Sequence, residues 1–103
     1  MKKAEIRVHN KPAGLLSETD SGKYIYQYLE DYDGFPVSFT LPFRKEPYEF
    51  NSFPAFFDGL LPEGIQLEAL LKSQKIDRND YFSQLLAVGR DTVGAITIIA
   101  EKK

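Results

Sequence analysis

Along the first third of the chain, apolar and polar residues alternate with the period of two that is typical of half-buried β-strands. The alternation over residues 4–8 (AEIRV) predicts a first strand. Turn residues at 10–14 (NKPAG) then precede a return strand that we expect to begin at residue 15. A second turn at 20–22 (DSG) leads to a third predicted strand at 24–29 (YIYQYL). Together these segments predict an antiparallel meander.

Two further strands are predicted later in the chain. Residues 37–41 (VSFTL) alternate until Pro42 ends the pattern, which indicates a fourth strand of the meander. Residues 44–52 are polar and irregular and include a proline, so we expect no regular element there. The Ile-rich run 95–100 (AITIIA) predicts a final strand, and its continuous apolar character places that strand at the buried centre of the sheet.

Between the meander and the final strand, capping residues indicate short helices. Asn51 or Ser52 is expected to cap the first of these, because serine and asparagine side chains accept hydrogen bonds from free helix amides. Pro54 fits its first turn. Gly59 is expected to close this helix in the left-handed conformation, which side chains resist.

Two more helices follow. Residues 65–73 have helical periodicity, and a third helix is expected to begin after a cap at Asp77, Asn79 or Asp80 and to run to Gly89. The order of strands, then short helices, then one strand predicts an α+β fold. We expect an antiparallel β-sheet, made of the meander plus the C-terminal strand, with the short helices packed on one face.

The predicted helix 65–73 has an unusual distribution of apolar residues. With about 100° between successive residues, Leu67, Leu70 and Leu71 lie on one side, which should face the core. Ile65 points away from them, with Ala69 beside it. Two interpretations follow: Ile65 precedes the regular helix and packs beneath the preceding proline loop, or it is an exposed apolar residue available to a partner.

Length and composition narrow the class of protein. A chain of 103 residues is expected to form a single domain, residues 1–103, with a radius of gyration of about 13 Å. The net charge of -2 argues against a main role in holding phosphate backbone. The chain has no cysteine and one histidine, which excludes disulfides and Cys- or His-rich metal sites, and we expect no cofactor. Without a membrane span or an apolar signal region, we expect a cytoplasmic protein.

The sequence has no recognisable catalytic site. No glycine-rich turn precedes a lysine as a phosphate-binding loop requires. The segment 89–91 (GRD) contains an Arg-Asp pair, but no Asn follows at the spacing of a kinase catalytic loop, and the chain has no Asp-Phe-Gly motif. His9 and the carboxylate pairs in turns and caps are better explained by local structure. We therefore expect a protein that is not an enzyme.

Four tyrosines between residues 24 and 32 suggest one other possibility. Aromatic side chains on an open sheet can stack unpaired bases, so the chain could be a nucleic-acid-binding module. No lysine or arginine lies among these tyrosines, however. A strand face covered by the protein's own helices is therefore the preferred interpretation.

Two segments together resemble the N-terminal subdomain of HipA-type toxin kinases. Residues 56–64 (FFDGLLPEG) match the pattern F-F-x-x-L-L-P-[DE], and residues 85–96 (LLAVGRDTVGAI) match L-L-x-x-G-R-D-x-V-G-A. The resemblance covers nearly the whole chain. As a free-standing subdomain, the chain resembles the HipS-like antitoxins of tripartite HipBST toxin–antitoxin systems. The motif residues that we expect to be structural are Phe56, Phe57, Gly59, Gly89, Arg90, Asp91 and Gly94.

This resemblance implies a function exerted on another protein. HipS-like antitoxins restrain HipT, a shortened HipA-type serine/threonine kinase, in systems that also contain HipB, a helix-turn-helix DNA-binding protein. We therefore expect an antitoxin that binds a HipT-like kinase and occludes or restrains its active site. The alternative is an N-terminal subdomain excised from a complete HipA-type kinase. The expected partner-binding residues are Asp58, Leu60, Leu61, Pro62, Glu63, Gly64, Ile65 and Ala69.

Overall fold

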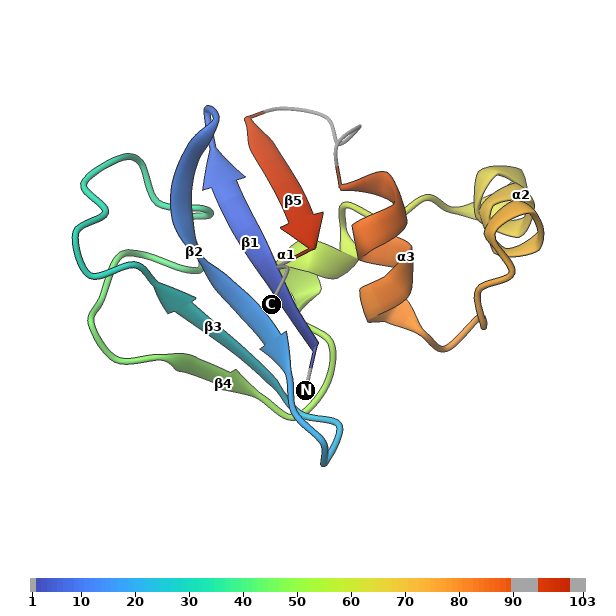
Figure 1. Cartoon of the computed structure of the whole chain (residues 1–103), viewed down its shortest axis with the longest axis horizontal. Helices are drawn as coiled ribbons and strands as arrows, with labels where there is room; N and C mark the ends of the chain where they lie inside the picture. Colours follow the sequence, from blue (N-terminus) through green and yellow to red (C-terminus); the bar gives the residue numbers. More distant parts are fainter. Residues whose placement is uncertain (1, 90–94, 101–103) are drawn as a thin grey trace.

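The computed structural model describes residues 2–89 and 95–100 and has an α+β fold, as predicted. Five strands form one antiparallel sheet, and three short helices lie between the fourth and fifth strands in the chain (Figure 1). The radius of gyration is 13.3 Å, close to the expected value. The strands are β1 (Lys2–Val8), β2 (Lys11–Glu18), β3 (Tyr24–Tyr28), β4 (Tyr48–Phe50) and β5 (Ile96–Ala100). The helices are α1 (Ala55–Asp58), α2 (Gly64–Gln74) and α3 (Tyr81–Val88).

The first hairpin turns earlier than the sequence predicts. His9 and Asn10 have φ angles of 51° and 66°, and these two residues alone connect β1 to β2. Such two-residue turns match the twist of the strands that they join. The predicted turn at 10–14 is therefore wrong, because Pro12 lies inside β2, where the register against β1 shifts by one residue at Ala13. A shift of this kind accommodates a proline that cannot donate to the sheet.

The fourth strand of the meander is not the one predicted. Residues 37–41 form no strand and have one isolated bridge, between Ser38 and Leu41. The amide of Val37 donates to the hydroxyl of Tyr28 at 2.9 Å instead of to a neighbouring strand. The strand that pairs with β3 is β4, which lies within the segment 44–52 that we expected to be irregular. Alternation alone is misleading here, since Val37 and Leu41 are buried in a loop while Phe39 between them is exposed.

The final strand lies at the edge of the sheet and not at its centre. The strand order is β4-β3-β2-β1-β5, so β5 pairs with β1. The end of α3 covers part of the outer edge of β5: the amide of Ile98 donates to the carbonyl oxygen of Gly89 at 2.9 Å. A Cβ atom at Gly89 would lie 2.3 Å from the carbonyl oxygen of Ile98. The apolar sequence of β5 is thus explained by the helix that covers it. Position 89 must be glycine, because a Cβ atom there would clash with the backbone of β5.

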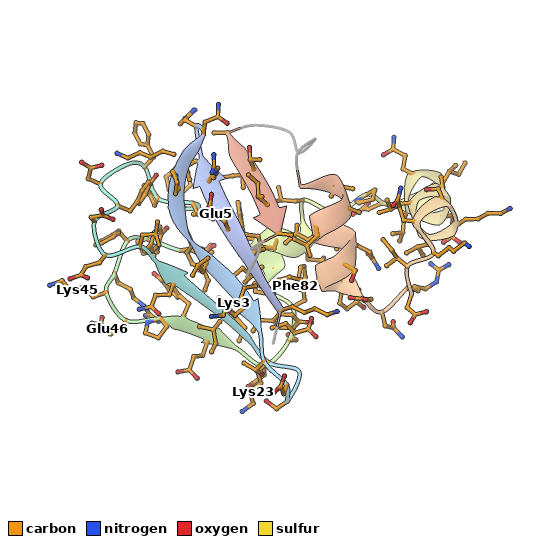
Figure 2. The ribbon with its side chains drawn as sticks, in the orientation of Figure 1. Lys3, Glu5, Lys23, Lys45, Glu46 and Phe82 are labelled. Carbon is orange, nitrogen blue, oxygen red and sulfur yellow. The ribbon has the colours of Figure 1, made fainter. Side chains whose placement is uncertain are left out.

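The hydrophobic core lies between one face of the sheet and the helices α1 and α3 (Figure 1). Phe57 of α1 and Phe82 and Leu85 of α3 are completely buried. Lys3 and Glu5 extend from the opposite face of the sheet, whereas Phe82 extends from α3 towards the sheet (Figure 2). The buried sheet residues include Ala4, Ile6, Val8, Ala13, Leu16, Tyr24, Tyr26, Tyr28 and Ile98, and the core also includes Tyr32, Val37 and Leu41 from the loop after β3.

The burial of four tyrosines rules out the nucleic-acid-binding alternative. These are Tyr24, Tyr26, Tyr28 and Tyr32. These four side chains are 9% exposed or less, so they cannot present a stacking surface to bases. The interpretation that helices and loops of the protein cover this aromatic face is confirmed, and the aromatic-sheet model of nucleic-acid binding is wrong.

The third helix begins at one of the three predicted caps. The carboxylate of Asp80 accepts hydrogen bonds from the amide of Ser83 at 3.1 Å and from its hydroxyl at 2.8 Å. Partial burial opposes ionisation of Asp80, but these hydrogen bonds and the charge of Lys2 at 3.6 Å prevail and lower its pKa. The cap satisfies a helix amide that would otherwise have no partner.

Candidate partner-binding surface

The segment that carries the first motif begins with α1, whose ends differ from the prediction. The N-cap of α1 is Pro54 in an extended conformation, and no side chain caps the helix, so neither Asn51 nor Ser52 has the predicted role. Gly59 has a right-handed φ of -65°, not a left-handed one, and its amide donates to the carbonyl of Ala55 at 3.1 Å. The chain therefore continues its helical turn through Gly59 instead of reversing there.

Two tight turns extend this segment to Leu61. The amide of Leu60 donates to the carbonyl of Phe57 at 3.0 Å, and the amide of Leu61 donates to that of Asp58 at 3.1 Å. These bonds span three residues, as in a 3₁₀-helix. Phe57 is fully buried, while Phe56, Leu60 and Leu61 are half-buried against the core. The apolar residues of this segment thus contribute to folding, and their exposed portions remain available for contact.

The direction of the chain changes at Gly64. This glycine has a φ of 59°, a conformation that residues with a Cβ atom rarely adopt. It is also the first residue of α2. Ile65 follows at once, and its side chain is 88% exposed. The interpretation that Ile65 packs beneath the proline loop is therefore wrong. Its predicted exposure is confirmed, and its availability to a partner stays a prediction.

The whole of α2 stands apart from the sheet (Figure 1). None of its residues is buried, and the helix packs chiefly against α3. Leu67, Leu70 and Leu71 are half-buried, so the prediction that they would enter the core is only partly right. Ile65 and Ala69 are exposed. An amphipathic helix in a globular protein usually buries its apolar stripe, so α2 has apolar surface in excess of what its own fold covers.

The C-terminal end of α2 is nevertheless well defined. Lys75 has a φ of 54°, and the amide of Ile76 donates to the carbonyl of Leu71 at 3.0 Å. This is the hydrogen bond of a Schellman motif, here with lysine at the position that glycine usually occupies. Arg78 forms an ion pair with Glu68 at 2.6 Å between largely exposed side chains, a kind of pair that contributes little to stability. The cap, more than the ion pair, gives α2 a defined end.

The predicted partner-binding residues therefore lie together along the surface from the end of α1 into α2. Asp58, Glu63, Gly64, Ile65 and Ala69 are exposed. The other three, Leu60, Leu61 and Pro62, are half-buried. Two acidic side chains, Asp58 and Glu63, flank the short apolar segment between the helices. The surface is thus apolar with negative charge at its border.

The predicted structural residues of the second motif are only partly described. Gly89 has the role in close packing given above, whereas Arg90, Asp91 and Gly94 lie outside the described residues. The structural role expected of Arg90, Asp91 and Gly94 stays a prediction.

A second exposed apolar group was not anticipated from the sequence. Phe35 is 72% exposed and Phe39 is 102% exposed, and both belong to the loop of residues 29–47 between β3 and β4. The erroneous strand at 37–41 concealed this surface, because it assigned Phe39 to the same buried face as Val37. The periodicity of a sequence cannot identify one highly exposed residue within an apolar segment.

Two classes of site find no support in the part of the chain that the structure describes. Across residues 2–89 and 95–100, no group of three or more His, Asp or Glu side chains is arranged to hold a metal ion. Within the same ranges, no helix has the length and apolar character needed to cross a membrane.

Comparison with known proteins identifies a matching family and several relatives. Residues 4–99 match the family described as "HipA N-terminal domain". An uncharacterised protein of Haemophilus influenzae is 30% identical over 103 residues, which cover the whole of this chain and 96% of that protein. The serine/threonine-protein kinase toxin HipA of Shewanella oneidensis is 32% identical over 98 residues. These cover 92% of this chain but only 22% of the kinase.

Solved structures give the same result. A structure described as the N-terminal domain of HipA toxin superposes with a TM-score of 0.78 at 28% identity, covering all of this chain and 95% of that one. The HipA chain in a complex of Shewanella oneidensis HipA, HipB and operator DNA superposes with a TM-score of 0.75 at 25% identity. The chain covers 24% of that HipA chain.

Proposed function

We propose, from the premise that the chain belongs to the HipA N-terminal domain family, that it is a HipS-like antitoxin. In this proposal residues 1–103 act as a single domain in the cytoplasm, without catalytic activity, and bind a HipT-like serine/threonine kinase. A HipB-like DNA-binding protein completes the complex. Relatives of two kinds support the idea: a full-length kinase toxin that carries this domain as about a fifth of its chain, and a protein of Haemophilus influenzae that consists almost entirely of it.

The observation that carries the proposal is the exposure of Ile65 on a helix without buried residues. A β-branched apolar side chain that is 88% exposed at the start of a helix gains free energy when a partner covers it. The positive φ of Gly64 holds this side chain at the point where α2 departs from the body. Ile65 then serves as the central anchor, with Leu60, Leu61, Pro62 and Ala69 around it.

The bordering charges define the kind of surface that Ile65 meets. Asp58 and Glu63 are exposed carboxylates, and they suit a basic surface such as the nucleotide-binding face of a kinase. Charge complementarity of this kind raises the association rate and sets orientation more than it raises affinity. Ile65 enters the kinase near its active site and either occludes it or prevents productive closure.

Regulation follows from the separation of the two chains. When the domain and the kinase belong to one chain, their contact is independent of concentration. A domain that binds in trans must also offset the loss of free translation and rotation. Inhibition consequently depends on the amount of antitoxin, and depletion of the antitoxin frees the kinase.

A second candidate is that this chain is the N-terminal domain of a complete HipA-type kinase. The observation that favours it is the 22% share of the Shewanella oneidensis kinase that the chain spans. Inspection of the native reading frame distinguishes the two candidates. A stop codon after Lys103, beside a frame that encodes a kinase without this domain, supports the antitoxin, whereas a frame that continues into a kinase supports the second candidate.

Co-expression tests the antitoxin directly. A HipT-like kinase from the same genome is produced in bacteria with the wild-type chain, with Ile65→Asp, or with Gln66→Asp, which adds the same charge at the neighbouring exposed position of α2. We expect wild type and Gln66→Asp to restore growth and to co-purify with the kinase, and Ile65→Asp to do neither. Circular dichroism checks that all three fold. A wild-type chain that neither binds nor protects overturns the proposal.

A further inference from the structure

The loop of residues 29–47, which connects β3 to β4, is long but firmly held. The hydroxyl of Tyr28 accepts a hydrogen bond from the amide of Val37 and donates one to the carbonyl of Leu41. The hydroxyl of Tyr32 donates to the carbonyl of Phe35, and that of Tyr48 donates to the carbonyl of Pro42 at 2.6 Å. Loops of this length without regular structure are usually functional. Three tyrosines here fix the backbone of such a loop.

This fixed loop directs phenylalanine side chains outward. Val37 and Leu41 are buried, which anchors the loop to the core. Phe39, which lies between these two residues, is fully exposed. Phe35, which precedes them, is 72% exposed. Single exposed apolar residues are ordinary, but bulky residues gathered at one place usually mark a contact surface. A loop that flexed freely could fold such side chains away, and the tyrosine hydrogen bonds prevent that.

The exposed phenylalanines border an apolar hollow. It has a volume of about 410 Å³, and its lining consists of Phe35, Pro36, Val37, Ser38, Phe39 and Phe56. None of these residues carries a charge. Two other hollows of the surface have charged walls, one with Glu30, Arg44 and Lys45 and one with Lys2, Glu18, Asp77 and Asp80. The chemistry of the phenylalanine hollow therefore suits an apolar side chain and not a phosphate or another anion.

We propose that this phenylalanine hollow is a second docking point for the kinase and receives a bulky apolar side chain of the kinase surface. The inference rests on the proposed function, since it assigns a further contact to the same partner. Continuity favours the kinase as the occupant: Phe56 lines the hollow, and Asp58, two residues later on α1, begins the surface that leads to Ile65.

The sizes of the relatives agree with this choice. In the solved Shewanella oneidensis HipA chain, the part that this chain matches is 24% of the whole, so a much larger body is available to the matching domain. A domain held by α2 alone could pivot about that helix. In Figure 1 much of the loop 29–47 extends past the sheet, away from α2, while the hollow itself lies between this loop and Phe56 of α1. A second contact there fixes the orientation of the domain on the kinase.

The experiment compares affinities of variants for the HipT-like kinase by titration calorimetry or biolayer interferometry. Phe39→Ser removes the exposed ring, and Phe43→Ser is the matched control, because Phe43 is an exposed phenylalanine of the same loop that does not line the hollow. We expect Phe39→Ser to weaken binding about fivefold to tenfold. Phe43→Ser should change it less than about twofold. Melting temperatures of both variants confirm that they fold.

A photo-crosslinking amino acid at position 39 identifies the occupant independently. We expect a crosslink to the kinase in the reconstituted complex. Unchanged affinity of Phe39→Ser, an equal loss in Phe43→Ser, or a crosslink only to a second copy of this chain overturns the second docking point. If Ile65→Asp still abolishes binding in that case, the proposed function stands without it. If the wild-type chain does not bind the kinase, both proposals fall together.

Discussion

Tyr26 and Tyr28 are two residues apart on β3, and both are buried, but their hydroxyl groups differ in hydrogen bonding. The hydroxyl of Tyr28 joins two backbone groups of the loop 29–47. The hydroxyl of Tyr26 has no hydrogen-bond partner within residues 2–89 and 95–100, and burial raises its pKa far above the usual value. One hydroxyl therefore organises the fold, and the other is a buried polar group without compensation.

Removing the hydroxyl of Tyr26 and removing the hydroxyl of Tyr28 should have opposite effects on stability. A buried polar group without a partner costs about 1–3 kcal/mol. We expect Tyr26→Phe to raise the free energy of unfolding by about 1 kcal/mol. Tyr28→Phe leaves Val37 and Leu41 without their partner, so we expect a loss of about 1–3 kcal/mol. Urea denaturation of the two variants measures both, and the same sign for both would contradict the assignment.

Asp80 gives the stability a dependence on pH. Its pKa is lower in the folded state than the ordinary value of 3.8, so folding favours the ionised form. The resulting stabilisation is complete above the ordinary pKa and is lost as the pH falls through the lower folded value. Asp80→Asn keeps a capping oxygen but cannot ionise.

The comparison of wild type with Asp80→Asn isolates this effect from the other carboxylates. We expect the melting temperature of wild type to fall more steeply than that of Asp80→Asn as the pH decreases from about 5 to 2. Above pH 5 the difference between the two proteins should be constant. Thermal unfolding followed by circular dichroism provides the measurement. Parallel curves across the whole range would show that Asp80 is not a folded-state acid of low pKa.

At the scale of the elements, the segment between α1 and α2 contains two glycines with opposite requirements. Gly59 has a right-handed φ of -65°, and a Cβ atom there would make only ordinary contacts, the nearest at 3.4 Å. Gly64 has a φ of 59°. The first position tolerates a side chain, whereas the second puts strain on any residue with a Cβ atom.

The same substitution at both positions tests this difference. Gly59→Ala should stabilise the protein by about 0.4–1 kcal/mol, because alanine restricts the unfolded chain. Gly64→Ala should destabilise the start of α2 by about 1–2 kcal/mol. Melting temperatures report the first effect, and amide exchange of Leu67, whose amide bonds to Glu63, reports the second. Similar behaviour of the two variants would mean that the turn at Gly64 adapts to a side chain.

The elements also show how far the sequence predicts this fold. Periodicity and capping chemistry predict β1, β3, α2 and α3, because each depends on local patterns that tertiary packing does not override. The position of the fourth strand depends instead on where the hydroxyl of Tyr28 binds the backbone, a contact between residues nine and thirteen positions apart. Likewise, the edge position of β5 depends on the hydrogen bond between Ile98 and Gly89. No local sequence pattern predicts this contact.

The candidate surface was predicted to a different extent at each of its parts. The helical wheel placed Ile65 away from the leucines correctly, because the geometry of a single helix determines it. Phe39 was missed, since its exposure arises from a loop held by tertiary hydrogen bonds. Gly59 was assigned the wrong conformation because glycine is permitted in both left-handed and right-handed regions.

The whole molecule combines a conventional core with apolar surface that the core does not use. The core buries Phe57, Phe82, Leu85 and four of the tyrosines, namely Tyr24, Tyr26, Tyr28 and Tyr32. In contrast, α2 and the loop 29–47 present Ile65 and Phe39 to solvent. A small domain with this distribution of apolar surface is suited to act by contact with a larger protein, which is the role proposed for it beside a HipT-like kinase.

The central claim is that this chain inhibits such a kinase through Ile65. The most direct measurement is kinase autophosphorylation in vitro, titrated with purified wild-type chain, Ile65→Asp and the control Gln66→Asp. We expect wild type and Gln66→Asp to inhibit at equal concentrations. Ile65→Asp should require at least about tenfold more protein, the equivalent of a loss of about 1.4 kcal/mol in binding. Equal inhibition by all three proteins, or none by wild type, contradicts the claim.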